Sequence, residues 1–318
     1  MKSVERFFEN MDYKKDLEEM CYNFSRIYGQ EAEKWFLELN LLLQKICKKW
    51  KLEELSLLSG ASLGIIISCY TKVYNKKVVI KIIPAFINRF EQEWMAYTML
   101  SKEYMCKLLD YDIENKILML EMIEPAMPFI YKQDKSKLEI FFRCIFQNTK
   151  VYTGEDGVES YWDLYERMRR LAQKSSYILE YREKCNARTN YIKNKYFGKD
   201  ELYYMHGDLH SGNVIKKGDA FIAIDPLGFC APKEFIFVRF AIFQLVFAEN
   251  KKEALSEIEQ FLKAYINVKK FYMALIIDTD LAILTGIVQL NDEYEMVNRF
   301  INVMDFLEKI VIGYDDFK

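Results

Sequence analysis

Hydrophobic and polar positions follow two different periods along the chain. Residues 1–50 place apolar side chains every three or four positions among many charges, which predicts two amphipathic helices that break near Gly29. Short apolar runs rich in β-branched residues then replace the helical period. These runs flank polar turns at residues 75–77 and 114–116, so the pattern predicts two β-hairpins. Residues 88–104, between the hairpins, show the i, i+3, i+4 spacing of a helix.

Helical spacing dominates beyond residue 125. The predicted helices cover residues 135–149, 160–195, 233–248, 251–265, 269–290 and 292–312. A single β-hairpin interrupts them, with its turn at Gly218–Asp219. An N-terminal part with an antiparallel sheet and helices, followed by a mainly helical C-terminal part, predicts an α+β fold in two lobes. We expect the N-terminal lobe to cover residues 1–124, with a helical extension at 1–50, and the C-terminal lobe to cover 125–318.

Composition and charge narrow the class of protein. The 318 residues are 51% apolar and 29% charged, as in ordinary globular enzymes, and the net charge of −2 offers no basic face to nucleic acid. The longest apolar stretch that we identify, residues 235–248, is shorter than a membrane span and contains Arg239. The N-terminus shows no signal-peptide core, and the seven cysteines show no CxxC spacing. We therefore expect a cytoplasmic enzyme that binds neither nucleic acid nor membrane.

Both histidines of the chain lie around one aspartate in a polar turn. His206, Asp208 and His210 could form a zinc site, but no further His or Cys lies at a useful spacing. A hydrolase triad would need a G-x-S-x-G nucleophile elbow, which the sequence does not contain. A polar loop that holds one buried histidine and performs no chemistry is the plainest alternative.

Phosphoryl transfer explains the spacing of the polar residues better. That reaction needs a carboxylate that accepts the proton of the attacking hydroxyl, and oxygen ligands for Mg²⁺ on the phosphate side. Kinase catalytic loops supply an Asp, an Asn five positions later, and an Asp at the end of the following hairpin. Here Asn213 follows Asp208 by five positions, and Asp225 lies twelve positions further on, after an apolar strand. The pattern predicts Asp208 as the catalytic base and Asn213 and Asp225 as the Mg²⁺ ligands.

The same reaction requires a cation for the nucleotide phosphates in the N-terminal lobe. Lys81 lies inside the apolar strand VVIKII, where an unpaired ammonium group would be costly to desolvate. The following helix offers Glu91 and Glu93 as partners. We favour Glu93, because Ala96 and Leu100 continue its side of the helix. Taken alone, Lys81 could also be an edge-strand lysine that reaches solvent.

These motifs resemble the aminoglycoside phosphotransferase-like small-molecule kinases. HGDLHSGNV followed by IDP is similar to the signature of that family, which reads HGDLHxxN with IDP in place of the DFG of protein kinases. KKWKLEELSLLSGASLGIIISC, VVIKI, EWMAYTML and LMLEMIEP occur in an order similar to the streptomycin kinase and hydroxyurea phosphotransferase branch. The resemblance covers roughly residues 45–245 and implies a two-lobed, protein-kinase-like fold.

The resemblance implies a role for each of these residues. Asp208 would be the base, Asn213 and Asp225 would hold Mg²⁺, and Lys81, braced by Glu93, would contact the phosphates of ATP or GTP.

The resemblance also implies three further parts. Glu121 and Ile123 would bound a hinge that binds the nucleotide base through the main chain. Residues 59–64, which form the sequence SGASLG, would be the nucleotide loop, with contacts from Ser59, Gly60 and Ser62. Two glycines in so short a loop are weak support by themselves. His206 would brace the catalytic loop, and His210 would also be structural.

The chain departs from the family pattern after IDP. Members of the family usually carry a segment such as GDPAYDLA, whose later aspartate fixes the active-site helix. The present chain reads APKEFIFVRF, which keeps Pro232 but has Glu234 as its nearest acid. A non-catalytic nucleotide-binding pseudokinase is therefore an alternative.

The phosphate acceptor is the least constrained part of the prediction. A polycationic aminoglycoside would need acidic side chains in the C-terminal lobe. We favour Asp278 and Asp280, which interrupt an apolar run, over Asp292, Glu293 and Glu295, although all five could be helix caps or solvated positions. We expect transfer of the γ-phosphoryl group to a hydroxyl of an aminoglycoside-like antibiotic. A metabolic kinase of the same fold, acting on choline, homoserine, fructosamine or a thioribose, is the alternative.

Overall fold

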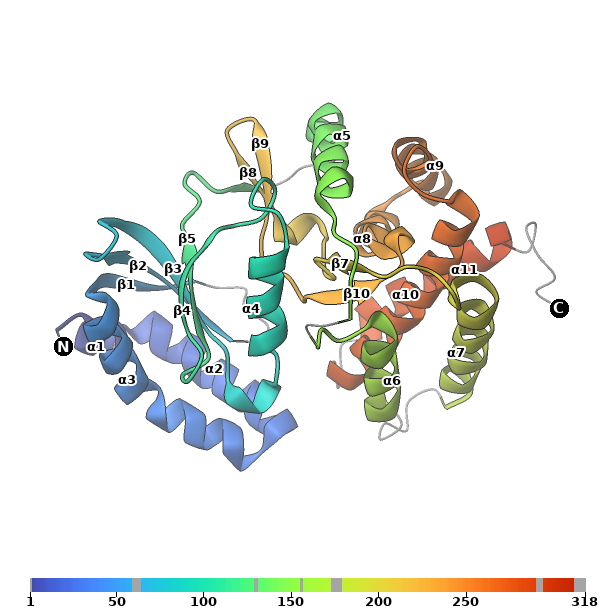
Figure 1. The fold of residues 1–318 in the computed structure, drawn as a ribbon. Coiled ribbons are helices and arrows are strands. Elements are labelled where there is room, and N and C mark those ends of the chain that lie inside the picture. Colours follow the sequence, from blue (N-terminus) through green and yellow to red (C-terminus); the bar gives the residue numbers. More distant parts are fainter. Residues whose placement is uncertain are drawn as a thin grey trace. The chain divides into compact units, whose positions relative to one another are not determined.

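The computed structural model describes residues 2–58, 64–128, 131–154, 157–172, 179–289 and 294–311. The chain divides into two compact units. Unit 1 contains Met1–Thr98 and Cys106–Pro125, and unit 2 contains Met99–Met105 and Ala126–Lys318. Figure 1 shows the helices and strands of both units along the chain.

Unit 1 is built on one antiparallel sheet with the strand order β1-β2-β3-β5-β4. Its elements are α1 (Lys2–Glu9), α2 (Met11–Tyr28), α3 (Gln30–Trp50), β1 (Leu52–Leu58), β2 (Ile65–Thr71), β3 (Lys76–Ile82), a 3₁₀ turn (Ala85–Ile87), α4 (Phe90–Met99), β4 (Leu108–Asp112) and β5 (Ile117–Glu121). The two predicted hairpins are β2–β3 and β4–β5. The first hairpin turns earlier than predicted, because Asn75 adopts a left-handed φ of 52° and Lys76 already pairs with Thr71.

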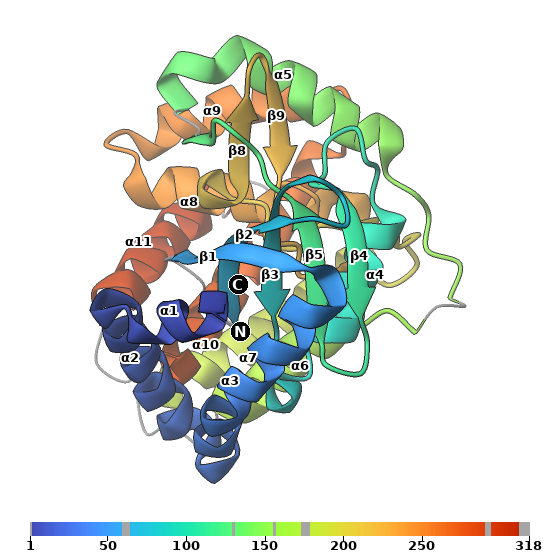
Figure 2. The ribbon, with the colours of Figure 1, turned by 90° about the vertical axis from the view of Figure 1, so that its left-hand side faces the viewer.

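The N-terminal helices supply a large part of the core of unit 1. Leu39, Leu43 and Ile46 of α3 are at most 1% exposed and share a hydrophobic cluster with Val78 and Ile80 of β3. Gly29 separates α2 from α3, as predicted. The structure adds α1, since Asn10 caps α2 by accepting hydrogen bonds from the next turn. Figures 1 and 2 show α3 on one side of the sheet and α4 on the other.

Unit 2 is mainly helical and carries two small sheets. Its helices are α5 (Tyr131–Asn148), α6 (Tyr161–Ala172), α7 (Leu179–Ile192), a π-helical turn (Lys193–Phe197), α8 (Val238–Phe247), α9 (Lys251–Leu262), α10 (Val268–Gln289) and α11 (Tyr294–Val311), with 3₁₀ turns at Ser211–Asn213 and Lys233–Phe235. Its strands are β6 (Met127–Pro128), β7 (Tyr203–Met205), β8 (Val214–Lys217), β9 (Ala220–Ala223) and β10 (Phe229–Ala231).

The predicted hairpin of unit 2 is β8–β9, with its turn at Gly218–Asp219. It is not the only β-structure there, because β6 pairs with β8 and β7 pairs with β10. These additional strands have two or three residues each, too few for a period to show in the sequence. The α+β class predicted from the sequence is confirmed.

Helix α10 forms the centre of unit 2. It packs against α6, α7, α8 and α11 (Figure 1). By length and composition it could cross a membrane, and it is longer than the apolar stretch that we expected to be the longest. However, 89% of its apolar segment is buried within the structure, which is the packing of a core helix.

Candidate active site

Lys81 and Glu93 form a buried ion pair in unit 1. Successive side chains of β3 point to opposite faces of the sheet, so Ile80 and Ile82 join the core while Lys81 faces the other way. The Nζ atom of Lys81 lies 2.6 Å from Oε1 of Glu93 on α4, and both residues are at most 5% exposed. Such a pair is stable only while both charges are present, because either one alone would be buried without compensation.

The second candidate partner of the lysine, Glu91, pairs with Lys116 at the surface. The hydrogen bond from Lys116 lowers the pKa of Glu91. Of the two glutamates, Glu93 is thus the one that contacts Lys81. The contact of Lys81 with nucleotide phosphates stays a prediction.

The predicted hinge follows β5. The main-chain N–H of Glu121 donates to the Lys107 carbonyl at 2.9 Å, and the Glu121 carbonyl accepts the thiol of Cys106 at 3.5 Å. Main-chain contacts to a nucleotide base would therefore come from residues 122 and 123, and the Ile123 side chain is buried. Ser59, Gly60 and Ser62 of the predicted nucleotide loop lie outside the described residues.

His206 fastens the predicted catalytic loop in unit 2. It follows β7 directly, and its Nε2 lies 2.8 Å from the carbonyl of Ile224, while its Nδ1 accepts the main-chain N–H of Asp208 at 3.3 Å. Burial lowers the pKa of His206 to about 4, so the ring is neutral at physiological pH. Since both ring nitrogens have partners, His206 is a brace and does not serve as a zinc ligand.

The turn after His206 depends on glycine. Gly207 has a φ of 83°, and a Cβ atom at this position would lie 2.4 Å from the ring of Phe229 on β10. A side chain there would have to displace the Phe229 ring.

Asn213 connects the catalytic loop to the predicted base. Its Nδ2 donates to the Asp208 carbonyl at 2.8 Å and to Asp208 Oδ2 at 3.3 Å. Because the amide nitrogen is bound on the Asp208 side, the amide oxygen points the other way. The Asp208 side chain itself is partly open, with 29% of its area exposed.

Asp225 follows β9 in a strained conformation. The Ile224 carbonyl accepts a hydrogen bond from the His206 ring, and the Ile224 N–H donates to the Asn213 carbonyl at 3.0 Å. These two bonds fix the main chain directly before Asp225. Asp225 then adopts a φ of 57°, a left-handed conformation that non-glycine residues rarely take and that occurs often at functional sites.

The donors at this end of the catalytic loop fit magnesium. The amide oxygen of Asn213 and the carboxylate of Asp225 are hard oxygen ligands. In the part of the chain that the structure describes, no three His, Cys, Asp or Glu side chains are arranged to hold a metal ion. In kinase sites, phosphate oxygens of the nucleotide supply further ligands of the Mg²⁺ ion.

Two further side chains approach the carboxylate of Asp208. Nε of Arg239, on α8, lies 3.8 Å from Oδ1, and Nε2 of His210 lies 3.7 Å from Oδ2. The His210 ring stacks on Phe243 with centroids 4.5 Å apart, and burial lowers its pKa. We did not assign Arg239 to the site from the sequence, although its charge inside an apolar helix was a usable signal.

No family model and no curated protein matches this sequence. Solved structures do match it. The choline kinase LicA from Streptococcus pneumoniae is 17% identical with a TM-score of 0.65, and the match covers 85% of this chain and 98% of that one. A choline/ethanolamine kinase family protein from Mesorhizobium loti is 10% identical with a TM-score of 0.59, covering 81% and 88%. The aminoglycoside phosphotransferase APH(4)-Ia is 10% identical with a TM-score of 0.58, covering 83% and 97%.

The chain has the fold of these small-molecule kinases. The predicted two-lobed, protein-kinase-like architecture is therefore confirmed, and the comparisons do not single out the streptomycin kinase branch. LicA has been solved with AMP, and a thermostable mutant of APH(4)-Ia has been solved with ADP and hygromycin B.

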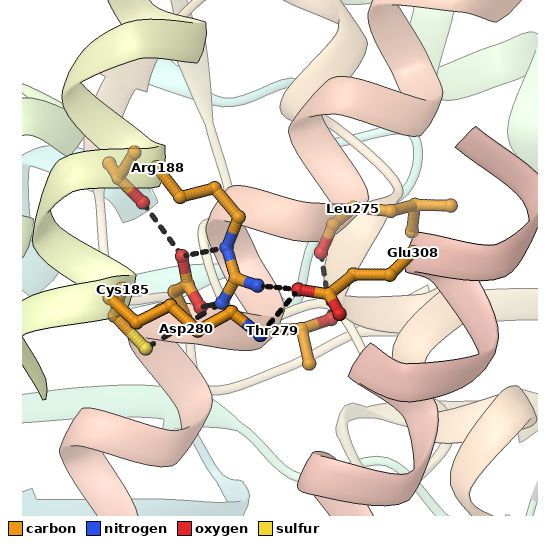
Figure 3. Close-up of polar contacts among 8 residues, drawn as sticks. Cys185, Arg188, Leu275, Thr279, Asp280 and Glu308 are labelled. Atoms are coloured by element: carbon orange, nitrogen blue, oxygen red, sulfur yellow. Dashed lines mark hydrogen bonds and ion pairs between the residues drawn. The ribbon is translucent and has the colours of Figure 1, made fainter. Parts of the chain in front are cut away.

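Within this fold, Asp280 is fully buried and is neutralised by the protein. The Arg188 guanidinium on α7 binds both of its carboxylate oxygens, and Thr189 donates to Oδ2 at 2.9 Å. Arg188 also binds Glu308 of α11, so three helices meet at one charge cluster (Figure 3). The Asp280 carboxylate therefore has no exposed surface in this structure that a cationic substrate could contact.

Asp278 is also internal. It is 1% exposed and accepts hydrogen bonds from Tyr161 at 2.8 Å and from Arg239 at 3.0 Å. Burial raises the pKa of Asp278, and that of Asp280 in the same way. Each acid already has an arginine partner, so a contact of Asp278 or Asp280 with the acceptor stays a prediction that their burial does not support.

The structure describes only one of the three other acidic candidates. Glu295 pairs with Arg299 at the surface of α11, and Asp292 and Glu293 lie outside the described residues. Glu234, the acid nearest to Pro232, is buried and lines a pocket of about 190 Å³ whose other lining residues are Asp200, Glu201, Tyr203, Lys233 and Lys270.

Proposed function

We propose that this protein is a small-molecule kinase that transfers the γ-phosphoryl group of a nucleoside triphosphate directly to a hydroxyl. The observation that carries the proposal is the catalytic loop, in which Asn213 binds Asp208 and the neighbouring main chain presents Asp225. The buried Lys81–Glu93 pair supplies the phosphate-binding cation that the same chemistry requires.

Each residue has one task in the proposed reaction. Asp208 accepts the proton of the acceptor hydroxyl while its oxygen attacks the γ-phosphorus. The bond from that phosphorus to the β–γ bridging oxygen breaks, so the products are a phosphate monoester and a nucleoside diphosphate. Lys81 offsets the charge of the phosphates and is held in place by Glu93. No phosphoenzyme is required.

Asn213 and Asp225 would hold Mg²⁺, which when bound neutralises phosphate charge. These two residues present oxygen donors after a rigid loop, so their task is to fix where the metal–nucleotide complex lies.

The similarities to solved kinases support two acceptor classes in particular. An aminoglycoside-like hydroxyl compound is the class predicted from the sequence motifs, and APH(4)-Ia supports it by its fold. A choline-type amino alcohol is the second candidate, supported by the similarity to LicA. The internal pairing of Asp278 and Asp280 gives no support to these two acids as the binding surface that a polycation would need.

The test is nucleotide consumption with Mg²⁺ across a panel of aminoglycosides, hydroxyurea, choline, ethanolamine and hydroxylated amino acids. We expect one acceptor class to stimulate turnover, and Asp208→Asn to lower kcat by on the order of 10²–10⁴-fold, the usual contribution of a general base. Asp219→Asn is the matched control, because Asp219 lies on the turn of the β8–β9 hairpin with its side chain 95% exposed. Equal turnover in both variants would contradict the assignment of the base.

A further inference from the structure

We propose that Arg239 is a positioning residue that fixes the carboxylate of Asp208 for proton transfer, an inference that rests on the kinase function proposed above. Arg239 lies near the start of α8, between Val238 and Phe240, which are both buried. Only 13% of its own side chain is exposed. A guanidinium group at such a place would be strongly unfavourable without carboxylate partners.

Two carboxylates compensate the charge of Arg239. One of its terminal nitrogens lies 3.0 Å from Oδ1 of Asp278, and its Nε lies 3.8 Å from Oδ1 of Asp208. Burial disfavours the charged guanidinium, but the charges of Asp278 and Asp208 outweigh it and raise the pKa of Arg239. The arginine is thus a permanent cation shared between a buried acid and the proposed base.

The far end of the arginine is fixed by two other helices. Asp278 belongs to α10, the central helix of unit 2, and its Oδ1 also accepts the hydroxyl of Tyr161 from α6 at 2.8 Å. Tyr161 and Asp278 are each 1% exposed. Arg239 therefore links the buried Asp278 of α10 to Asp208 of the catalytic loop.

Both oxygens of Asp208 have a neighbour on a different side. Arg239 approaches Oδ1, whereas Asn213 donates to Oδ2 at 3.3 Å. A carboxylate with a partner at each oxygen has a fixed plane, which a base acting on one particular hydroxyl requires.

The hydrogen bonds of Arg239 are incomplete. Its Nε and the Oδ2 of Asp278 are buried and have no hydrogen-bond partner within the described residues. Buried donors that lack an acceptor are rare in folded proteins and need a reason. Nε faces Asp208 at 3.8 Å, and catalytic hydrogen bonds often shorten when substrates bind. We infer that this contact closes to a hydrogen bond in the reacting complex.

The location of Arg239 also bears on the departure from the family pattern. The segment APKEFIFVRF lacks the aspartate that fixes the active-site helix in the family, and Arg239 is the charged residue of that segment that contacts the catalytic loop. In the proposal, the catalytic loop is held by a cation, Arg239 of α8, in place of that aspartate.

Kinetics of Arg239→Gln and Arg239→Lys test the inference. We expect Arg239→Gln to lower kcat by on the order of 10²-fold, the effect of a misplaced catalytic group, with the nucleotide KM changed less than about threefold. Arg239→Lys should recover part of the loss, and millimolar methylguanidinium should recover part of the activity of Arg239→Ala.

Arg188→Gln is the matched control, because Arg188 is a second buried arginine with an aspartate partner, Asp280, and has no contact with Asp208 in the structure as described. We expect it to lower the Tm without changing kcat below that Tm. If Arg239→Gln behaves in the same way, Arg239 only stabilises the fold and the inference is wrong.

A second measurement does not depend on turnover. The Tm values of wild type, Asp208→Ala, Arg239→Gln and the double variant form a cycle that reports whether the two side chains interact. We expect the Tm shifts of the two single variants not to add up to the shift of the double variant. Additive shifts would contradict an interaction between Arg239 and Asp208, whatever the activity of the wild type. Absence of phosphoryl transfer in the wild type would instead count against the proposed kinase, since the cycle is measured independently.

Discussion

The two histidines show how little a residue type reveals before its contacts are known. A histidine beside an aspartate is often a general acid or base. In His206, however, both ring nitrogens are hydrogen-bonded to the main chain, and the residue is only 5% exposed. His210 keeps part of its ring exposed and faces Asp208 with Nε2. The role of each histidine therefore depends on whether one of its ring nitrogens faces a side chain of the site, as in His210, or both bind the main chain, as in His206.

His206 should make the stability of the protein depend on pH. Its pKa is about 4 in the folded chain and near 6.5 when unfolded, so between these values the unfolded chain binds a proton that the folded chain does not. Stability should therefore fall as the pH drops from 6.5 to 4, with a contribution on the order of 3 kcal/mol. Urea midpoints measured over this range should show a shallower fall for His206→Gln.

His210→Gln is the comparison for that experiment, because His210 is the only other histidine and is less buried. It should keep most of the wild-type pH dependence. A His206→Gln profile as steep as that of the wild type would assign the loss of stability to carboxylates instead.

At the scale of elements, α3 is part of the core although the sequence suggests an appendage. Its buried side is continuous with the sheet through Leu39, Leu43 and Ile46, while Leu37 and Leu41 on the same helix are 83% and 69% exposed. The amphipathic period predicted the helix but not its partner, since a helical face does not state which sheet it covers.

Leu43 and Leu41 offer a matched pair for testing this packing. Leu43→Ala should lower the free energy of unfolding by about 2–5 kcal/mol, because Leu43 is fully buried and the change leaves a cavity. Leu41→Ala should change it by less than about 0.5 kcal/mol, as for other exposed positions. Chemical denaturation of both variants decides the matter, and equal losses would contradict the packing of α3.

The elements that the sequence predicted well are those with local signals. The β2–β3 and β4–β5 hairpins have β-branched runs and polar turns, and the β8–β9 hairpin has Gly218 at its turn. Helix α4 ends five residues before its predicted end at 104, where Ser101 begins a hydrogen-bonded turn. Such boundaries depend on competing local bonds that a period does not register.

The contacts that escaped prediction join residues that lie far apart in the chain. Asp208, Asn213 and Asp225 lie within one loop and hairpin, so their spacing was informative. Arg188 and Asp280 are 92 positions apart, and Tyr161 and Asp278 are 117 apart. The sequence therefore displayed Asp278 and Asp280 as charges in an apolar run without showing what neutralises them.

At the scale of the whole molecule, the proposed reaction divides its tasks between the two units. Lys81 and Glu93 belong to the sheet unit, which would bind the nucleotide phosphates, and Asp208 belongs to the helical unit, which would accept the proton. Nucleotide affinity and turnover should therefore respond to different substitutions.

Thermal shifts with Mg²⁺ and nucleotide separate these tasks. A ligand at 100 times its Kd stabilises the folded state by about 2.7 kcal/mol, so wild type and Asp208→Asn should both gain Tm. Glu93→Gln should lose most of this gain, since Lys81 is no longer held by a carboxylate. Glu91→Gln is the control and should keep it, because Glu91 lies on the same helix but is exposed and pairs with Lys116. An undiminished gain in Glu93→Gln would remove Lys81 from the nucleotide site.

The charge cluster of Arg188, Asp280 and Glu308 has a consequence for how this sequence can diverge. Loss of Arg188 alone would remove the arginine partner of the buried Asp280 carboxylate, and loss of Asp280 alone would leave the buried guanidinium with one carboxylate partner fewer. Neither intermediate is well tolerated, whereas an apolar pair of similar volume can be. Positions 188 and 280 should therefore covary among relatives of this protein, present together as opposite charges or replaced together, although 92 positions of chain separate them.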